Sequence, residues 1–189
     1  MLSVIIATQD CERALVPTLA ALVSGATSGL ISEVLVADAG SRDDTAAVAE
    51  VAGCNFMVMA GATTAQRLKA AAAKARAPWL LLLRPGTILD EPWIRDTQRF
   101  TERASRTGSA AVFRRGAPTQ SSLRDALSLL ASALGARPRP EQGLLLGKEF
   151  YAALGGHAET AADPERDLIR RIGRRRIARL SAIAYTNAP

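Results

Sequence analysis

Aromatic side chains are scarce in this sequence. Two Trp, two Tyr and four Phe make up only 4% of the 189 residues. Proteins that hold single-stranded nucleic acid stack its bases on such rings, so the scarcity argues against that class of binding protein. Hydrophobic residues nevertheless make up 48% of the chain. The core must therefore be built mainly from Ala, Leu, Val and Ile.

Cysteine and long apolar runs are also lacking. Cys11 and Cys54 are the only cysteines, and their spacing fits neither a metal site nor a redox motif, so we expect free thiols in a reducing compartment. No apolar run approaches the roughly 20 residues that a membrane span needs, and no signal peptide is visible. These absences predict a cytoplasmic protein.

Charge and length describe an ordinary globular domain with a basic surplus. The charged residues make up 22% of the chain, which is typical of a folded protein, and 189 residues suit one domain with a single sizeable core. The net charge of +6 favours anionic partners such as phosphates, nucleic acid or an acidic membrane surface, but does not choose among them.

Short apolar runs alternate with amphipathic stretches through four rounds in the first half of the chain. The alternation predicts an α/β protein with a mostly parallel sheet and helices on both faces. Strands are expected at 2–7, 34–37, 54–60 and 79–83. One helix is expected from about Leu15 to a stop at Gly25, with an apolar face that includes Val23. A second is expected after Ser41, with acidic residues in its first turn, and a third at 64–76. Ligands of such sheets lie at the carboxyl ends of the strands, which points to 8–10, 38–41 and 84–87.

The second half is less regular. It is predicted to contain a helix from Pro92 to about Arg106, a strand at 110–114, a helix at 121–134, a break at 137–140, a helix at 165–172 and a closing strand at 177–185. We take the break as a loop within the domain rather than as a linker.

The segment 34–45, VLVADAGSRDDT, has the strongest local signal. A buried strand ends at Asp38, whose carboxylate can accept hydrogen bonds from a uracil ring or a ribose hydroxyl. Gly40 then permits close approach of the backbone to a ligand. The alternative is a simple strand-to-helix turn in which Asp38 and Ser41 only cap the following helix.

Five motifs in order resemble the family 2 glycosyltransferases of the GT-A fold. They are SVIIATQDCE, VLVADAGSRDDT, WLLLLRPGTIL, EQGLLLGKEFYAALGGH and PERDLIRRIGRRR, and they cover nearly the whole chain. The short bacterial subgroup with a D-Q-G loop is the most similar. The resemblance implies a three-layer α/β/α sandwich with a Rossmann-like sheet, and one domain over 1–189. It also implies a nucleotide-binding half over about 1–90, an acceptor-side half over about 91–189, and transfer of a hexose-type sugar from a nucleotide-sugar donor.

The resemblance also assigns site residues. The donor side comprises Thr8, Asp10, Asp38, Gly40, Ser41, Lys69 and Arg84, and the acceptor side comprises Gln142, Gly143 and His157. Glu165 matches the general base and Asp167 a further acid of the same helix. Each has a plainer alternative, because an acid at a helix start also suits the helix dipole. Lys69 then lies on a solvated helix face, and His157 in a loop at the cleft edge.

Arg84-Pro85-Gly86 departs most from the family pattern. The family places carboxylates there, which hold Mg²⁺ or Mn²⁺ against the sugar diphosphate. Arg84 has no oxygen ligand to offer a metal, but its guanidinium matches phosphate geometry bidentately. Either Arg84 contacts the diphosphate directly, or catalysis is lost and the chain is a GT-A-like domain that binds a nucleotide or a partner protein.

The arginine-rich run 170–179, RRIGRRRIAR, has three interpretations. It forms a solvated surface, it contacts an anionic lipid or lipid-linked acceptor at the inner face of a membrane, or it binds nucleic acid. The solvated surface is favoured, because the apolar residues of the run fit a helix and a strand packed into the core. Neither the acceptor nor the oligomeric state follows from the sequence.

Overall fold

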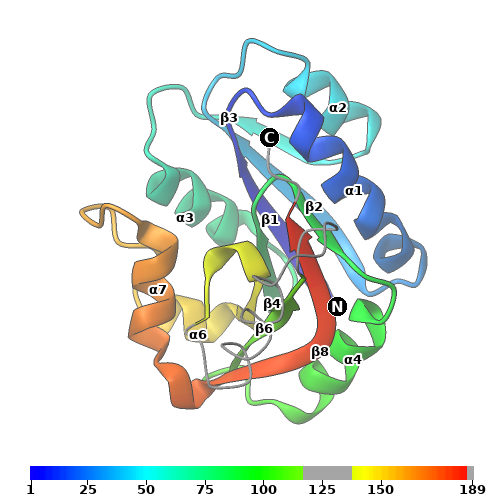
Figure 1. Ribbon diagram of the computed structural model, residues 1–189. Coiled ribbons are helices and arrows are strands. Elements are labelled where there is room, and N and C mark those ends of the chain that lie inside the picture. The colour runs from blue at the N-terminus through cyan, green and yellow to red at the C-terminus, as the bar shows by residue number, and fades with distance from the viewer. Residues whose placement is uncertain (117–137, 187–189) are drawn as a thin grey trace, which may run out of the picture.

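The computed structural model describes residues 1–116 and 138–186 and shows one eight-stranded sheet with helices on both faces (Figure 1). The strands are β1 (Leu2–Thr8), β2 (Ile31–Asp38), β3 (Asn55–Val58), β4 (Trp79–Leu83), β5 (Thr87–Leu89), β6 (Ala110–Arg115), β7 (Leu144–Gly147) and β8 (Ile177–Thr186). The helices are α1 (Glu12–Thr27), α2 (Thr45–Val51), α3 (Thr64–Lys74), α4 (Trp93–Arg103), α6 (Lys148–Ala153) and α7 (Pro164–Ile172), with 3₁₀ turns η1 (Pro140–Gln142) and η2 (Arg174–Arg176). The predicted three-layer α/β sandwich is confirmed.

The order of the strands is β3-β2-β1-β4-β7-β6-β8-β5. The four predicted strands of the first half pair in parallel, with β1 between β2 and β4 and with β3 beyond β2. Strands β1 and β4 are buried along most of their length, which explains their unbroken apolar runs. Thr8 pairs with Asp38, so the carboxyl ends of β1 and β2 meet at one edge of the sheet.

The second half adds the antiparallel part of the sheet. β7 runs antiparallel to β4 and β6, β8 runs parallel to β6, and β5 pairs antiparallel with β8. The sequence patterns predict β6 and β8 but not β5, β7 and α6, because segments of three to six residues are too short to show a period. The predicted helix at 121–134 lies outside the described residues.

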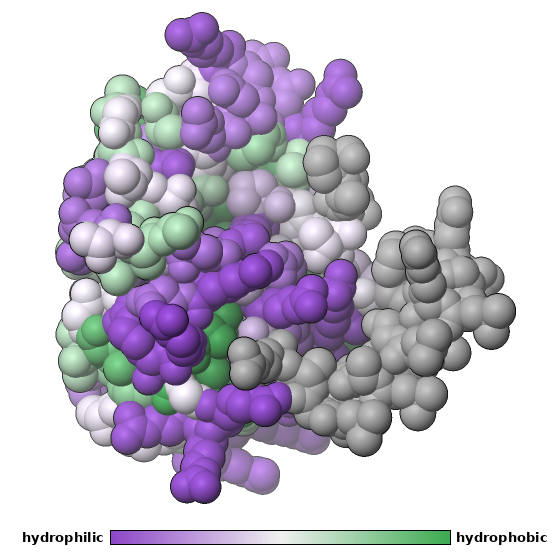
Figure 2. Space-filling model, turned by 60° about the vertical axis from the view of Figure 1, so that its left-hand side comes forward, coloured by the Kyte–Doolittle hydropathy of each residue, from purple (hydrophilic) through white to green (hydrophobic). Residues whose placement is uncertain are grey.

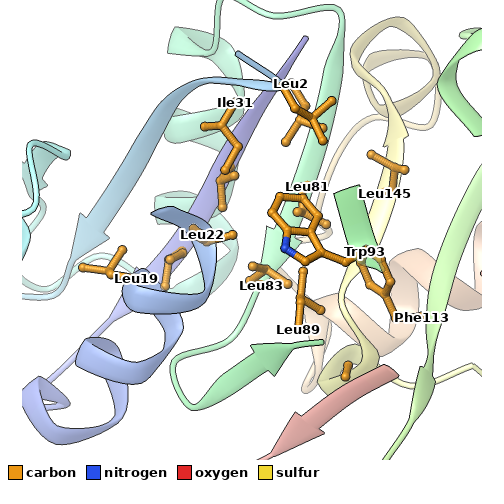
Figure 3. Close-up of a cluster of buried hydrophobic side chains, with 14 of the residues drawn as sticks. Leu2, Leu19, Leu22, Ile31, Leu81, Leu83, Leu89, Trp93, Phe113 and Leu145 are labelled. Carbon is orange, nitrogen blue, oxygen red and sulfur yellow. The ribbon is translucent and has the colours of Figure 1, made fainter. Parts of the chain in front are cut away.

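Two clusters of apolar side chains, one on each face of the sheet, form the core. One cluster packs α1, α2 and α4 against the sheet and includes Trp93, which lies among leucines from β4, β5 and α1 (Figure 3). The other cluster packs α3, α6 and α7 against the opposite face and is rich in Ala and Leu. No helix within the described ranges is long and apolar enough to cross a membrane.

Three local predictions were wrong. Helix α1 continues through Gly25 to Thr27 instead of ending at the glycine, and Val23, predicted on its apolar face, is 59% exposed. The acidic residues after Ser41 precede α2 instead of occupying its first turn, because the helix begins only at Thr45. Gly25 serves packing rather than termination, since a Cβ there would lie 2.5 Å from the Trp93 ring and 2.9 Å from Ile31.

We expect Gly25→Ala to lower the free energy of unfolding by about 1 kcal/mol. Overpacking a core costs about 1–3 kcal/mol, and the better helix propensity of Ala returns up to about 1 kcal/mol. Urea unfolding of this variant and of Ala20→Gly, which changes helix propensity alone at an exposed position of α1, would separate the two effects. A Gly25→Ala protein more stable than wild type would show that the Trp93 ring shifts to accommodate the added methyl group at little cost.

Candidate functional site

The loops after β1 and β2 are tied together at the carboxyl edge of the sheet. The backbone N–H of Asp10 donates to Ser41 Oγ at 2.8 Å, and the Arg42 N–H donates to Asp10 Oδ1 at 2.7 Å. The Glu12 N–H donates to Asp43 Oδ2 at 3.0 Å. Asp10 has a φ of 44°, a left-handed conformation that Asp tolerates better than most residues. The predicted donor residues Asp10 and Ser41 are therefore in direct contact.

Asp38 holds the turn after β2. Its carboxylate accepts from Thr8 Oγ1 at 2.8 Å, from Ser41 Oγ at 2.5 Å, and from the N–H groups of Gly40 and Ser41 at 2.7 and 2.6 Å. Burial raises the pKa of Asp38, but these hydrogen bonds outweigh it and hold the pKa below its ordinary value. Asp38 and Thr8 are each 1% exposed, and Gly40 adopts a φ of 92°. Both carboxylate oxygens are thus engaged within the chain.

Helix capping by Asp38 and Ser41 is not observed. Asp44 is the N-cap residue of α2 and its side chain makes no capping hydrogen bond, whereas Asp43 Oδ1 accepts from the N–H of Thr45, the first residue of the helix, at 3.1 Å. The four hydrogen bonds of Asp38 instead give the loop between β2 and α2 its shape. This loop and the one after β1 present backbone atoms, together with the exposed Asp10 and Gly40, at the sheet edge.

Arg67 is a charged residue of this edge that the sequence analysis missed. It projects from α3 and is 5% exposed, and its guanidinium donates to the carbonyl oxygens of Thr8 and Ala37 and to Thr64 Oγ1. Burial lowers the pKa of Arg67, and the negative charge of Asp38 opposes that shift. The sequence did offer one indication that Arg67 is buried, because it lies next to Leu68, among the core positions of α3.

Arg84 lies just beyond β4 among three carboxylates. Its Nε and Nη2 bind Glu165 Oε2 at 2.7 and 2.6 Å, and its Nη1 binds Glu141 Oε1 at 2.9 Å. Asp163 Oδ1 lies 3.7 Å from Nη2. Glu141 comes from η1, whereas Asp163 and Glu165 come from the start of α7. The structure thus brings together the predicted residues Arg84 and Glu165, with two acids that the sequence analysis did not single out.

Arg84 and its three acid partners, Glu141, Asp163 and Glu165, form the Arg84 cluster. Glu165 has the least exposed carboxylate of this cluster. Its side chain is 17% exposed, against 28% for Glu141 and 36% for Asp163. Burial raises the pKa of Glu165, and the hydrogen bond and charge of Arg84 only partly offset that rise. A raised pKa makes a carboxylate a stronger base, which suits the role that the family resemblance assigns to Glu165.

Asp167, the second predicted acid, belongs to a different network. Its carboxylate binds Arg170 at 2.5 Å and Arg171 at 2.7 Å. The Arg171 guanidinium also donates to the carbonyl oxygens of Leu154 and Gly156, at 2.6 Å each. Asp167 therefore anchors the loop after α6 to α7 through Arg171.

The predicted acceptor-side residues serve internal contacts. Gln142 is buried, accepts from the Arg139 N–H at 2.8 Å and donates to the Phe113 carbonyl oxygen at 2.7 Å. Gly143 adopts a φ of 69°, and a Cβ there would lie 2.8 Å from Leu83. These contacts join the start of β7 to β4 and β6.

His157 and Lys69 differ sharply in exposure. His157 is fully buried, not at a cleft edge, and its Nδ1 lies 2.7 Å from the Tyr151 hydroxyl. Burial, reinforced by the nearby charge of Arg171, lowers the pKa of His157 to about 4. Lys69 forms a 3.0 Å ion pair with Glu159, and both side chains are nearly half exposed.

The described residues do not fit the metal that the family resemblance implies. Within 1–116 and 138–186, no group of three or more His, Cys, Asp or Glu side chains could hold a metal ion. The three acids of the Arg84 cluster converge on a guanidinium, whose positive charge occupies the space between them. The side chains of this cluster, rather than Mg²⁺ or Mn²⁺, are therefore the groups on which a mechanism can be built.

Solved structures share this architecture. Residues of S. aureus TarS 1–349 superpose with a TM-score of 0.74 at 14% identity, over 98% of this chain and 60% of that one. The glucosyl-3-phosphoglycerate synthase of Mycobacterium tuberculosis, in complex with Mn²⁺, UDP and glucosyl-3-phosphoglycerate, gives 0.71 at 16%, over 100% and 72%. The mannosyltransferase PcManGT of Pyrobaculum calidifontis, in complex with GDP-Man and Mn²⁺, gives 0.73 at 15%, over 100% and 57%.

The chain has a GT-A glycosyltransferase fold. At identities below 20% the likeness concerns the GT-A fold alone, and the chain spans only 60% of TarS 1–349 and 57% of PcManGT. No protein-family model and no curated protein matches the sequence. The function of this GT-A domain must therefore be argued from its own residues.

Proposed function

We propose that the chain transfers a sugar from a nucleoside-diphosphate donor to an acceptor not yet identified, with Arg84 in place of a metal ion. The observation that carries this proposal is the contact between the Arg84 guanidinium and the protected Glu165 carboxylate at the end of β4. A guanidinium that can bind a diphosphate is therefore hydrogen-bonded directly to a carboxylate whose pKa is raised. The neighbours TarS and PcManGT, solved with UDP-GlcNAc and GDP-Man, support the donor class.

The donor would lie across the carboxyl ends of β1, β2 and β4. The base and ribose meet the loops that the buried Thr8 and Asp38 hold in shape, at the exposed Asp10 and Gly40 and at Ser41. The diphosphate reaches Arg84 by displacing Asp163, the most distant of its three acids at 3.7 Å. The ion pair between Lys69 and Glu159 is nearly half exposed, so a phosphate oxygen can replace Glu159 as the partner of Lys69. Arg84 would then stabilise the charge that develops on the departing diphosphate.

Glu165 would act as the general base. It accepts the proton of the acceptor hydroxyl as that oxygen attacks the anomeric carbon, and the bond from that carbon to the diphosphate oxygen breaks. The electron pair of the broken bond stays on the diphosphate beside Arg84. Asp167, bound to Arg170 and Arg171, has no direct part in this scheme.

A non-catalytic GT-A-like domain is the second candidate, and the charge of the Arg84 cluster favours it. Three carboxylates surround one guanidinium, so the cluster as a whole is negative and repels a diphosphate. Glu165 is also already engaged by Arg84. On this interpretation the ion pairs only tie β4 to η1 and α7, and the domain binds a nucleotide or a partner protein without turnover.

Calorimetric titration with UDP, GDP and TDP, each with EDTA and with excess Mn²⁺, tests the two candidates. We expect binding of one nucleotide to survive EDTA and to weaken at least tenfold in Arg84→Gln, about 1.4 kcal/mol. Glu141→Gln removes a competing negative charge and should tighten binding. Arg175→Gln changes an exposed arginine of η2 and should leave binding unchanged.

The other outcomes separate the alternatives. Binding only in the presence of Mn²⁺ would contradict a metal-independent site. Binding without hydrolysis or transfer of any donor sugar would favour the non-catalytic domain. No binding of any nucleotide would contradict the donor site itself.

A further inference from the structure

A groove on the α7 side of the molecule combines an apolar floor with an arginine rim. It has a volume of about 630 Å³ and lies between α7, η2 and the segment before η1. Its residues include Arg139, Arg166, Ile169, Arg170, Arg174 and Ile177. None of these belongs to the Arg84 cluster. In Figure 2, which brings the α7 side forward, a small apolar area in the lower half of the face is flanked by hydrophilic side chains.

The floor of the groove belongs to the hydrophobic core. Ile169 is 7% exposed and packs in the cluster formed by α3, α6 and α7, and Ile177 packs against the same cluster while remaining partly exposed. Gly173 ends α7 with a φ of 80°, which turns the chain so that Ile177 enters β8 beside Ile169. The floor is therefore a fixed apolar surface rather than a chance grouping of mobile side chains.

The rim carries a surplus of positive charge. Arg166 and Arg170 are one helical turn apart on α7, and their side chains are 63% and 80% exposed. Their acid partners Asp163 and Asp167 are shared with Arg84 and Arg171 respectively. Among the described residues, Asp163 and Asp167 are thus each shared between two arginines, so Arg166 and Arg170 keep part of their positive charge for an anion.

We infer that this groove binds the phosphate headgroup of an anionic membrane lipid, with the first methylene groups of its acyl chain on Ile169 and Ile177. Arginine suits a phosphate because its planar guanidinium donates two parallel hydrogen bonds. A free phosphate ion would leave the apolar floor in water, whereas a lipid covers both parts of the groove. The groove would bind such a lipid whether or not the protein transfers a sugar. Of the three interpretations of the arginine-rich run 170–179, the groove favours the contact with an anionic lipid.

Nucleic acid suits the groove less well. No aromatic side chain lines it among the described residues, so bases would have no ring on which to stack. Phe150 is 2% exposed and lies beneath Arg176 of the arginine-rich run, whose Cζ is 5.7 Å from the ring centroid.

Vesicle sedimentation of the full chain tests the inference. We expect binding to phosphatidylcholine vesicles that contain about one third phosphatidylglycerol, and none to phosphatidylcholine alone. Arg166→Gln/Arg170→Gln should weaken binding at least tenfold, because each basic residue near an anionic surface contributes about 1 kcal/mol. The matched control is Arg99→Gln/Arg103→Gln, which removes the same charge from exposed positions of α4 and should change binding less than threefold. Equal losses in the two double variants would overturn the inference in favour of diffuse attraction.

A second measurement distinguishes a lipid site from a phosphate site. Thermal unfolding is followed with monomeric dihexanoyl phosphatidic acid and with glycerol 3-phosphate at equal concentration. A larger rise in Tm with the short-chain lipid, lost in Arg166→Gln/Arg170→Gln, supports the groove. Equal shifts would show that the apolar floor is not used and would overturn the inference. Tighter binding of single-stranded RNA than of the vesicles, at equal phosphate concentration, would also overturn it.

Discussion

Glu165→Gln is expected to reduce sugar transfer at least 100-fold, since a positioned general base contributes about 10²–10⁴-fold. The amide keeps the shape of the side chain and can still accept from Arg84 Nε, but it cannot take a proton. Because burial raises the pKa of Glu165, folding disfavours its ionised form relative to the unfolded chain, and we expect the neutral amide to change the free energy of unfolding by less than about 1 kcal/mol. Release of nucleoside diphosphate, with the donor that titration identifies, measures the effect.

Two variants control for this result. Glu141→Gln removes the same charge from the same Arg84 cluster, and Asp167→Asn removes a carboxylate from the neighbouring network on α7. Both should retain transfer within about tenfold. A loss in Glu141→Gln as large as in Glu165→Gln would assign the effect to the charge around Arg84 and would exclude a specific role of Glu165 as base.

Acidification from pH 7 to pH 4 is expected to lower the free energy of unfolding by about 3 kcal/mol through His157 alone. Burial lowers the pKa of His157 from its ordinary 6.5 to about 4, and each unit corresponds to about 1.4 kcal/mol. The unfolded chain binds a proton below pH 6.5 while the folded chain does not, so stability is fully present above pH 6.5. It is then lost as the pH falls towards 4.

Urea unfolding at several pH values measures this dependence. His157→Gln should lack the fall between pH 6.5 and pH 4, whereas Tyr151→Phe, which removes the hydroxyl 2.7 Å from Nδ1, should keep it. The raised pKa of Glu165 acts in the opposite direction in all three proteins, so the difference between them isolates the histidine. Parallel curves for wild type and His157→Gln would show that His157 titrates normally.

Most of the fold could be predicted from local patterns. The runs at Leu2–Thr8 and Trp79–Leu83 are β-branched or leucine-rich and buried, so their residue types alone predict strands of a parallel sheet. The short β5 and β7 could not be predicted, because their pairing depends on β8 and β4, which are far away in the sequence. Gly25 was misjudged for a similar reason, since its partner Trp93 lies 68 residues later.

The sequence by itself determined the α/β class and the absence of carboxylates in Arg84-Pro85-Gly86, and it predicted the edge of the sheet at which a ligand would bind. These follow from residue types and their spacing along a short stretch of chain. Only the tertiary structure decided that Glu141, Asp163 and Glu165 surround Arg84, and that His157 is buried. The physical reason is that the burial and pKa of a side chain, and the charges around it, depend on distances between segments that are remote in sequence.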